Sequence, residues 1–285
     1  MPADPLGVDR WKLRTRTLAV GRVPLLMGVV NVTPDSFSDG GRFLDPAAAV
    51  AHGLRLAAEG ADILDIGGES TRPGAAPVAA DEELRRVLPV IEALCRQAGV
   101  PVSIDTSKAV VARAAVAAGA EIINDIRALA GDPEMLVLAA ESGCGVCVMH
   151  MRGTPQTMQH SPEYADVLQE VFDYLRTRRD ALMAAGIEQG RIALDPGIGF
   201  GKTTEHNLTL LGNAGQFHEL GCPVLVGPSR KRFIGELIGD LQADRTAGTA
   251  AVAVALAWQG VQILRVHDVA AVRHALTVSV ACDGM

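Results

Sequence analysis

Polar side chains capable of chemistry recur in this sequence directly after short apolar runs. In chain order they are Asn31, Glu69 behind Gly67 and Gly68, Asp105, Asn124 with Asp125, His150, Asp195, Ser229 behind Gly227 and Pro228, and Arg265 with His267. Carboxylates and amides suit the hydrogen-bonding edges of a flat nitrogen heterocycle, whereas Lys231, Arg265 and His267 suit a phosphate or diphosphate group. Arg265 and His267 flank Val266, so a strand would place both on one side. These residue types predict a site for a heterocyclic, phosphorylated ligand.

Each of these residues also has a purely structural interpretation. Asn31 and Asn124 could cap loops, and Asp105 could cap the helix that follows it. His150 lies between two methionines, which is more typical of a packed histidine than of a ligand. The functional interpretation gains from their shared position, because the polarity falls at only one end of the apolar runs.

Those apolar, β-branched runs alternate with longer helical patterns along the chain. They occupy residues 25–30, 62–66, 100–104, 121–123, 145–149, 191–195, 222–226 and 261–266. Near-continuous apolar strands indicate burial on both faces, as in a parallel sheet covered by helices. No linker or repeat divides the chain, and VNVTPDS follows the first run where a doubly wound sheet would show G-x-G-x-x-G.

We therefore predict a single (β/α)8 TIM barrel over residues 1–285, with catalysis at the carboxyl ends of its strands. An N-terminal extension covers about residues 1–24, and its segment 14–24 is expected to form a short strand or hairpin that closes the barrel bottom. Alanine-rich helices are predicted over 109–119 and 244–260, and the longest helix over 161–186. Asp45, followed by proline, predicts a helix start.

The stretch DPGIGFGKT, residues 195–203, looks like a phosphate-binding loop but fails the pattern. G-x-x-x-x-G-K-[ST] requires glycine six residues before the lysine, and this chain has Pro196 there. Proline has no N–H to offer a phosphate. We instead expect Asp195 to present a carboxylate at the end of the sixth strand, and Lys202 to begin the next helix, capped by a threonine of the pair 203–204.

Composition and charge argue against several classes of protein. The chain is 48% hydrophobic and 21% charged, and its net charge of −7 without a basic run argues against nucleic-acid binding. The longest apolar run, 250–258, is about half of a membrane span, and the N-terminus lacks the apolar core of a signal peptide. Five cysteines in a chain of this length suit a reducing cytoplasm. Cys144 and Cys147 form a C-x-x-C within an apolar run and are expected to pack in the core.

The sequence favours a weakly held metal over a tight one. There is no H-x-H and no cluster of closely spaced ligands, which argues against zinc. Mg2+ that arrives with a diphosphate needs only one or two oxygen donors, and Asn31 could supply one. Two long loops rich in small residues, 31–43 and 67–83, are predicted to act as lids, and Phe37 in the first favours that interpretation.

The motifs resemble those of the dihydropteroate synthases of the folate pathway. In order, between about residues 25 and 268, they are VNVTPDSFSDGG, ESTRPGA, SIDTSKA, AGAEIINDI, VMHMRGTPQTMQ, LDPGIGFGKT, GPSRKRF and RVHDV. The resemblance implies a transferase that condenses 6-hydroxymethyl-7,8-dihydropterin diphosphate with p-aminobenzoate, giving 7,8-dihydropteroate and diphosphate by an SN1-like course with Mg2+. It also implies sulfonamide inhibitors, which resemble the second substrate, and a homodimer.

The resemblance further implies which residues form three subsites. The pterin would contact Asp105, Asn124, Ile126, Met149, Asp195, Phe200, Gly227, Lys231 and Arg265. The diphosphate would contact Asn31, which would also bind Mg2+, and Thr71, Arg72, Arg265, Val266 and His267. The p-aminobenzoate would contact Ser36, Phe37, Arg72, Pro73, Phe200 and Lys231. Of these, Asp105, Asp195, Lys231, Arg265 and His267 would be catalytic. Arg232, where some members have serine, is not counted as catalytic.

Two other functions share part of this pattern. A pterin-binding methyltransferase domain acting on methyltetrahydrofolate would have the barrel and the carboxylates, but would not need the TPDSFSDGG and STRPGA loops or a diphosphate site. A paralogue that binds pterin without turnover would show lost loop or anion-site residues, and none is missing from this sequence.

Overall fold

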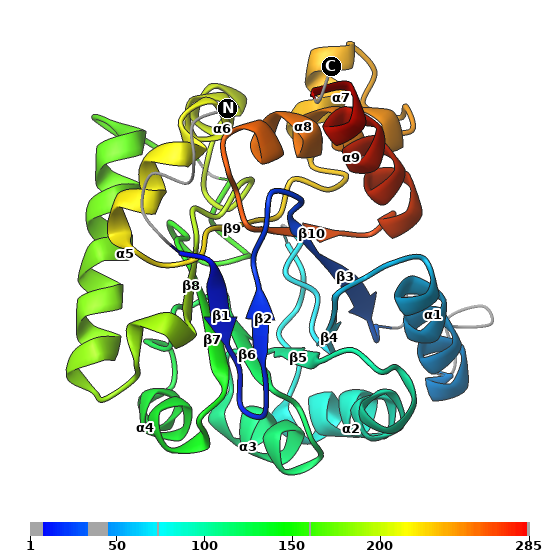
Figure 1. The fold of residues 1–285 in the computed structure, drawn as a ribbon. Coiled ribbons are helices and arrows are strands. Elements are labelled where there is room, and N and C mark those ends of the chain that lie inside the picture. Colours follow the sequence, from blue (N-terminus) through cyan, green and yellow to red (C-terminus); the bar gives the residue numbers. More distant parts are fainter. Residues whose placement is uncertain (1–7, 34–44, 73, 160, 284–285) are drawn as a thin grey trace.

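Parallel strands form a barrel with helices around it (Figure 1). The computed structural model describes residues 8–33, 45–72, 74–159 and 161–283. Within these ranges the barrel strands are β3 (Leu25–Asn31), β4 (Ile63–Gly67), β5 (Val102–Asp105), β6 (Ile122–Asp125), β7 (Gly145–Met149), β8 (Ile192–Asp195), β9 (Leu225–Val226) and β10 (Ile263–Val266). They pair in the order β8-β7-β6-β5-β4-β3-β10-β9, and a parallel bridge between Leu194 and Val224 joins the two ends. The predicted (β/α)8 barrel is confirmed, with a strand at each of the predicted runs.

The register of these strands brings their carboxyl ends to one rim of the barrel. Asn31 at the end of β3 pairs with Gly67, Gly67 pairs with Asp105, and Asp105 pairs with Asn124. Because parallel strands run in the same direction, the polar residues that end them gather at this rim. Active sites of (β/α)8 barrels lie at the same end.

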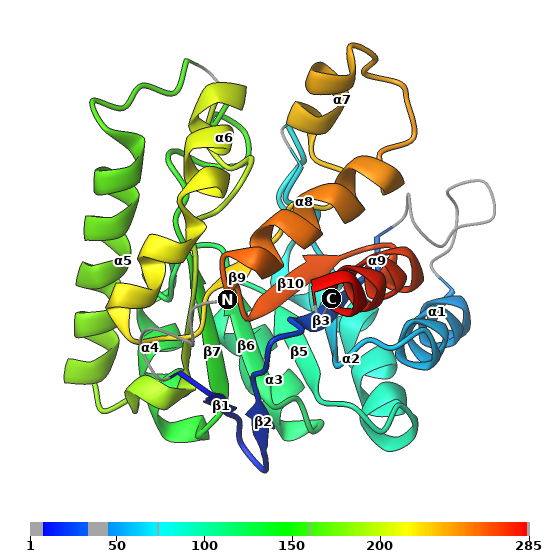
Figure 2. The same ribbon diagram turned by 45° about the horizontal axis from the view of Figure 1, so that its top comes forward.

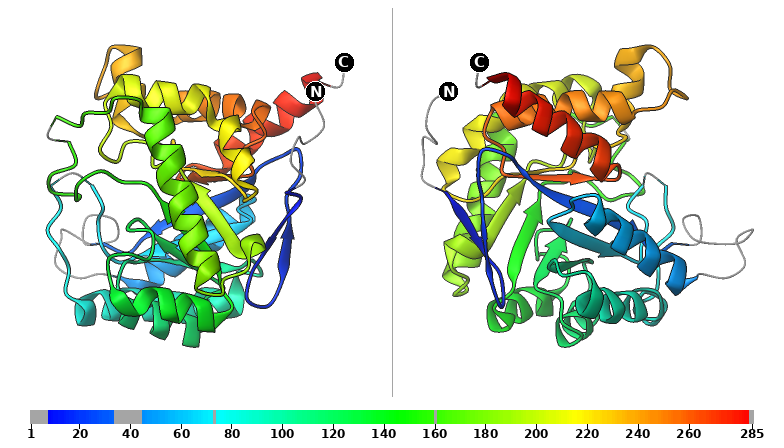
Figure 3. Two further views of the ribbon diagram at one scale, coloured as in Figure 1. Left: turned by 90° about the vertical axis from the view of Figure 1, so that its left-hand side faces the viewer. Right: turned by 45° about the vertical axis from the view of Figure 1, so that its right-hand side comes forward.

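The helices form an outer layer around the strands (Figure 2). They are α1 (Pro46–Ala58), α2 (Ala80–Gln97), α3 (Ala109–Ala117), α4 (Pro133–Ser142), α5 (Val167–Ala184), α6 (Thr204–Gly212), α7 (Arg232–Ile238), α8 (Thr246–Trp258) and α9 (Val269–Asp283), with 3-10 helices η1 (Gln189–Arg191) and η2 (Ala214–Leu220). In Figure 3 the green α5 lies along the barrel wall in the left view. The red α9 and blue α1 lie on the side of β10 and β3 in the right view.

Side-chain caps determine where two of the predicted helices begin. Asp45 accepts a hydrogen bond from the first turn of α1, as predicted. The longest predicted helix was expected to begin at Ser161, and that boundary is wrong, because α5 begins at Val167. The Asp166 carboxylate accepts hydrogen bonds from two N–H groups of the first turn of α5, whereas Ser161 has a φ of +47° and cannot belong to a helix.

A hairpin closes the end of the barrel opposite the polar rim. Its strands, β1 (Arg10–Lys12) and β2 (Thr17–Ala19), pair antiparallel. Trp11 is fully buried against the interior side chains at the amino ends of the barrel strands, and its Nε1 donates a hydrogen bond to the carbonyl oxygen of Arg191 at 2.9 Å. The predicted N-terminal hairpin at the barrel bottom is confirmed, although its first strand precedes the predicted segment 14–24.

Cys144 and Cys147 are buried free thiols in the apolar core, as expected from their apolar run. Within the described residues, none of the helices combines the length and the apolar character that a bilayer crossing requires.

Candidate active site

Four side chains from four strands meet inside the polar rim. The Arg265 guanidinium on β10 donates from Nε to Asp65 Oδ2 on β4 at 2.6 Å, and from Nη2 to Asp105 Oδ2 on β5 at 2.8 Å. Asn124 on β6 donates from Nδ2 to the same Asp65 oxygen at 3.1 Å. The two carboxylates therefore fix the guanidinium plane in the barrel mouth, and the amide helps to hold Asp65.

Asp65 was not among the predicted site residues. It lies within the run 62–66, which was interpreted simply as a buried strand, although a carboxylate in such a strand is itself a signal. Asp65 is fully buried, and among the described residues its Oδ1 has no hydrogen-bond partner. A buried carboxylate requires a compensating charge, and Arg265 supplies it.

Asp195 and Asp105 are carboxyl groups whose pKa values are raised by burial. Asp195 ends β8 with 7% of its surface exposed, and its Oδ1 accepts a hydrogen bond from Gly197 N at 2.7 Å. Burial raises the pKa of Asp195 to about 6, although the Gly197 N–H and the charge of Lys231 oppose the shift. The pKa of Asp105 is also raised by burial, against the effect of Arg265. Both groups therefore titrate closer to neutral pH than ordinary aspartates.

Lys231 and Phe200 lie together at the same rim. The Lys231 ammonium is 4.1 Å from the centre of the Phe200 ring, which suits a cation–π contact. Burial and the neighbouring Arg265 lower the pKa of Lys231 to about 8. Gly199 makes room for this arrangement, because a β-carbon there would lie 3.0 Å from Lys231 Cδ. A cation and an aromatic ring thus form one wall beside Asp195.

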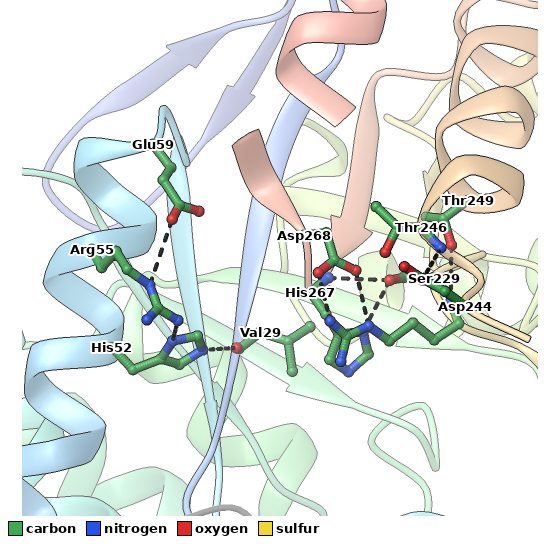
Figure 4. Close-up of polar contacts among 11 residues, drawn as sticks. Val29, His52, Arg55, Glu59, Ser229, Asp244, Thr246, Thr249, His267 and Asp268 are labelled. Carbon is green, nitrogen blue, oxygen red and sulfur yellow. Dashed lines mark hydrogen bonds and ion pairs between the residues drawn. The ribbon is translucent and has the colours of Figure 1, made fainter. Parts of the chain in front are cut away.

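His267 is held against the loop between β9 and α7 (Figure 4). Its Nδ1 lies 2.9 Å from Ser229 Oγ, and its backbone N–H donates to the same oxygen at 3.1 Å. Burial, followed by the nearby charge of Arg265, lowers the pKa of His267 to about 3. The expected pair of cations thus becomes, in the structure, one cation and one neutral imidazole.

The residue between Ser229 and Lys231 anchors that loop. Arg230 adopts a left-handed φ of 57°, and its side chain pairs with Asp268, with Nε 2.9 Å from Oδ2 and Nη2 2.5 Å from Oδ1. Its backbone N–H donates to Thr249 Oγ1 at 3.1 Å. Figure 4 shows Asp268 and Thr249 near His267, and on its left the side chain of His52 against the carbonyl oxygen of Val29.

Asn31 and Asp105 flank the bare backbone of Gly67. A β-carbon at Gly67 would lie 3.8 Å from Asn31 Oδ1 and 3.6 Å from Asp105 Oδ2, so glycine leaves space between two oxygen atoms. No group of three or more His, Cys, Asp or Glu side chains able to hold a metal ion occurs within the described ranges. Any ion here would have few protein ligands.

The loop after β4, which carries the predicted Thr71 and Arg72, is joined to the loop after β7. Gly74 N donates to Pro155 O at 3.1 Å, and Gln156 Nε2 donates to Ala75 O at 3.0 Å. The side chain of Thr71 is half-buried and that of Arg72 is exposed.

The remaining predicted residues fall into two groups. Met149 and Val266 are buried, Ile126 is half-buried, and Gly227 lies beside Arg265, whose Cβ would be 3.8 Å from a β-carbon there. Ser36, Phe37 and Pro73, with most of the predicted lid 31–43, lie outside the described residues. His150 is a packed histidine, as its flanking methionines indicated, with its ring edge-on to Tyr174.

The rim of this barrel holds carboxylates, an amide and a fixed guanidinium, which suit a flat nitrogen heterocycle. Comparison with known proteins identifies the class of protein. A family model described as "Pterin binding enzyme" matches residues 27–267. Dihydropteroate synthase of Escherichia coli (strain K12) is 50% identical over 246 residues, which cover 86% of this chain and 87% of that protein.

Solved structures give the same result. That of Xanthomonas albilineans dihydropteroate synthase with 4-aminobenzoic acid has a TM-score of 0.90 at 51% identity, covering 97% of this chain and 99% of that one. That of the Yersinia pestis dihydropteroate synthase in a sulfonamide drug complex has a TM-score of 0.90 at 45% identity, covering 97% and 100%. The chain belongs to the pterin-binding enzymes, and within them to the dihydropteroate synthases.

Proposed function

We propose that this protein joins 6-hydroxymethyl-7,8-dihydropterin diphosphate to p-aminobenzoate, forming 7,8-dihydropteroate and releasing diphosphate. The observation that carries this proposal is the network in which Arg265 donates to Asp65 and Asp105 and Asn124 donates to Asp65, with Asp195 on the same rim. Carboxylates recognise the amino and ring N–H groups of a pterin, and a guanidinium plane fixed at its edges can stack on the ring face.

The proposed pterin site uses the predicted residues in complementary roles. Asp195, Asp105 and Asn124 bind the polar edge of the ring, and Lys231 donates to the pterin carbonyl and ring nitrogen. Met149 and Arg265 pack on its faces, with Ile126, Gly227 and Phe200 at its borders. Ionised Asp105 and Asp195 also stabilise positive charge that develops on the ring.

The diphosphate is proposed to leave from the neighbouring side of the rim. The bond between the pterin methylene carbon and the diphosphate oxygen breaks, and the electron pair leaves with the oxygen. Arg265 and His267, the Val266 backbone, and Thr71 with Arg72 offset the charge of the departing group. His267 becomes a cation there if the diphosphate raises its pKa.

Mg2+ is proposed to accompany the diphosphate. The oxygen of Asn31 beside the bare Gly67 fits an ion that has few protein ligands and takes the rest from phosphate and water. When bound, Mg2+ would neutralise charge on the leaving group. Asn31 would then orient the ion and its phosphate.

The p-aminobenzoate is proposed to lie against Phe200 and Lys231, with Arg72, Pro73, Ser36 and Phe37 completing the site. Its amine carries a free electron pair at neutral pH, attacks the methylene cation and then loses a proton, so positioning matters more than a strong base. Sulfonamides would compete at this position, as their complex with the Yersinia pestis enzyme suggests.

The assembled protein is proposed to be a homodimer in the cytoplasm. Large apolar side chains that are exposed on adjacent helices support a dimer, notably Trp258 on α8 and Val278 on α9. Sedimentation velocity at micromolar protein should give twice the mass of 29.8 kDa, and a purely monomeric species would contradict this.

A turnover assay tests the central proposal. With both substrates and Mg2+, dihydropteroate and diphosphate should form in equal amounts, and a chelator should slow the reaction because the leaving group loses its counter-charge. Absence of product at saturating substrate would mean a pterin-binding protein without turnover. Undiminished turnover after chelation would contradict the role of Mg2+ alone.

A further inference from the structure

The loop after β8, residues 196–203, has an unusual backbone that the proposed chemistry leaves unexplained. Gly197, Gly199 and Gly201 have left-handed φ values of 69°, 82° and 66°, alternating with other residues. A β-carbon on Gly197 would collide with the carbonyl oxygen of His150, and one on Gly201 with that of Arg152. The loop is therefore pressed onto the segment that follows β7.

Lys202 lies at the centre of this loop with only 3% of its surface exposed. Its Nζ is 2.9 Å from Gly197 O, 3.0 Å from Phe200 O and 3.3 Å from His150 O. It is also 3.0 Å from His150 Nδ1. Burial lowers the pKa of Lys202 to about 7, and its ammonium form has three N–H donors and no acceptor. Three of these four contacts can therefore be hydrogen bonds at once, and His150 Nδ1 is the acceptor in its contact, with the imidazole neutral. The prediction that Lys202 begins α6 is wrong, although Thr203 does cap that helix.

This geometry is the reverse of a phosphate-binding loop. There, backbone N–H groups and a lysine surround an anion from outside the protein. Here two carbonyl oxygens of the loop, those of Gly197 and Phe200, converge on Lys202 together with the His150 carbonyl oxygen of the segment after β7. The ammonium occupies the centre that the loop encloses, so its hydrogen bonds serve the loop itself.

The groups tied to Lys202 are also those that hold the substrate-facing residues. The peptide unit of Gly197 donates its N–H to Asp195 Oδ1, and its carbonyl accepts from Lys202. Phe200 is tied through its carbonyl to Lys202, while its ring contacts Lys231. Lys202 thus connects Asp195, which is proposed to bind the pterin, to Phe200.

We propose that Lys202 is a positioning residue that holds Phe200 in place for the second substrate by fixing loop 196–203 from within. The inference rests on the proposed location of p-aminobenzoate against Phe200. The backbone of Asp195 is held by strand β8 whether or not the loop is intact. Phe200 lies within loop 196–203, so its position depends on that loop. Loss of the ammonium should therefore affect p-aminobenzoate more than pterin.

The decisive experiment restores the missing group. Lys202→Ala removes three methylenes and the ammonium, which propylammonium replaces and 1-propanol does not. The KM for p-aminobenzoate should rise about tenfold or more in this variant, with the KM for the pterin diphosphate changed by less than about threefold. Propylammonium should lower the raised KM, whereas 1-propanol should not. Lys202→Met, which keeps the stem, should show the same defect, and the exposed Lys12→Met should behave as the wild type.

Lack of rescue by propylammonium, or equal rescue by 1-propanol, would overturn the proposal. A rise in both KM values by the same factor would do so as well. If wild type and Lys12→Met made no dihydropteroate, the proposed function would fail instead. Lys202 would then be judged by whether propylammonium raises the melting temperature of Lys202→Ala and not that of wild type.

A milder variant covers the case in which Lys202 variants do not fold. Tyr164 OH donates to Gly201 O at 2.8 Å and so ties the same loop from outside. Tyr164→Phe keeps the ring and removes one hydrogen bond. It should raise the KM for p-aminobenzoate severalfold and leave that for the pterin diphosphate unchanged. An unchanged KM for p-aminobenzoate would contradict the role of the loop.

Discussion

At the scale of single residues, the site is built around one cation with two carboxylates. Arg265 is held by Asp65 and Asp105, so a ligand meets a guanidinium that is already neutralised at its edges and open at its face. The positive charge that balances a diphosphate must then come largely from residues around Arg265. We therefore expect part of that charge to come from Arg72, in the loop after β4.

Asp65→Asn should destabilise the protein and weaken catalysis together. It removes one partner of a buried ion pair, which typically costs about 3–5 kcal/mol of unfolding free energy. Arg265 should also lose its fixed orientation, lowering kcat/KM by about tenfold or more. Urea unfolding and steady-state kinetics measure both effects. The control Asp9→Asn, in an exposed pair with Arg10, should leave the free energy of unfolding unchanged. The same result at Asp65 would show that the pair is unimportant.

Pterin binding should depend on pH through Asp195. Because burial raises its pKa to about 6, the carboxylate is ionised and accepts N–H donors above that pH, and is protonated below it. The contribution of Asp195 to the affinity for a pterin without diphosphate should therefore be complete above about pH 7 and fall below about pH 6. Asp195→Asn should bind about 10²-fold more weakly and lose this step.

Calorimetric titration between acidic and neutral pH measures both properties. Asp105 titrates in wild type and variant alike, so the difference between the two profiles reports Asp195. The exposed Asp180→Asn should retain the wild-type profile. Tight binding by Asp195→Asn would rule out the assigned role.

At the scale of elements, local sequence patterns determine the strands well and the loops poorly. Apolar runs predicted all the barrel strands, because a buried parallel strand consists of consecutive apolar residues. The start of α5 was missed, because Ser161 and proline mimic a cap that Asp166 provides. The roles of Asp65 and Lys202 depend on partners that no local pattern contains: Arg265 lies 200 residues from Asp65, and His150 lies 52 residues from Lys202.

Two glycines with the same backbone geometry should respond differently to substitution. Gly197 has φ 69° and lies against the His150 carbonyl, whereas Gly186 has φ 93° with no heavy atom within 4 Å of its would-be β-carbon. Alanine at either site carries the cost of a left-handed conformation, about 1–2 kcal/mol. Only Gly197→Ala must also displace backbone, so it should lose more stability and raise the KM for the pterin diphosphate. Urea unfolding with kinetics tests this, and equal effects at the two sites would contradict it.

At the scale of the whole molecule, the two ends of the barrel have separate tasks. The carboxyl rim holds the charged groups of the site, whereas the barrel interior at the opposite end is filled by an apolar cluster and sealed by the hairpin. Gly145 at the start of β7 leaves room for this seal, because a β-carbon there would lie 2.6 Å from Leu13 Cδ2 and 3.4 Å from Trp11 Cε2. Stability and chemistry should therefore respond independently to substitutions at the two ends.

Trp11→Ala tests this separation. Removing a fully buried Trp should lower the free energy of unfolding by about 3–5 kcal/mol, because the barrel bottom retains a cavity. Trp11→Phe keeps a six-membered aromatic ring but loses the hydrogen bond to Arg191, so it should cost less than Trp11→Ala. Both variants should keep the KM values of the two substrates, measured well below the unfolding transition. A KM that rises in proportion to the lost free energy of unfolding would contradict this separation. It would mean that packing at the hairpin end determines the positions of the residues at the carboxyl rim.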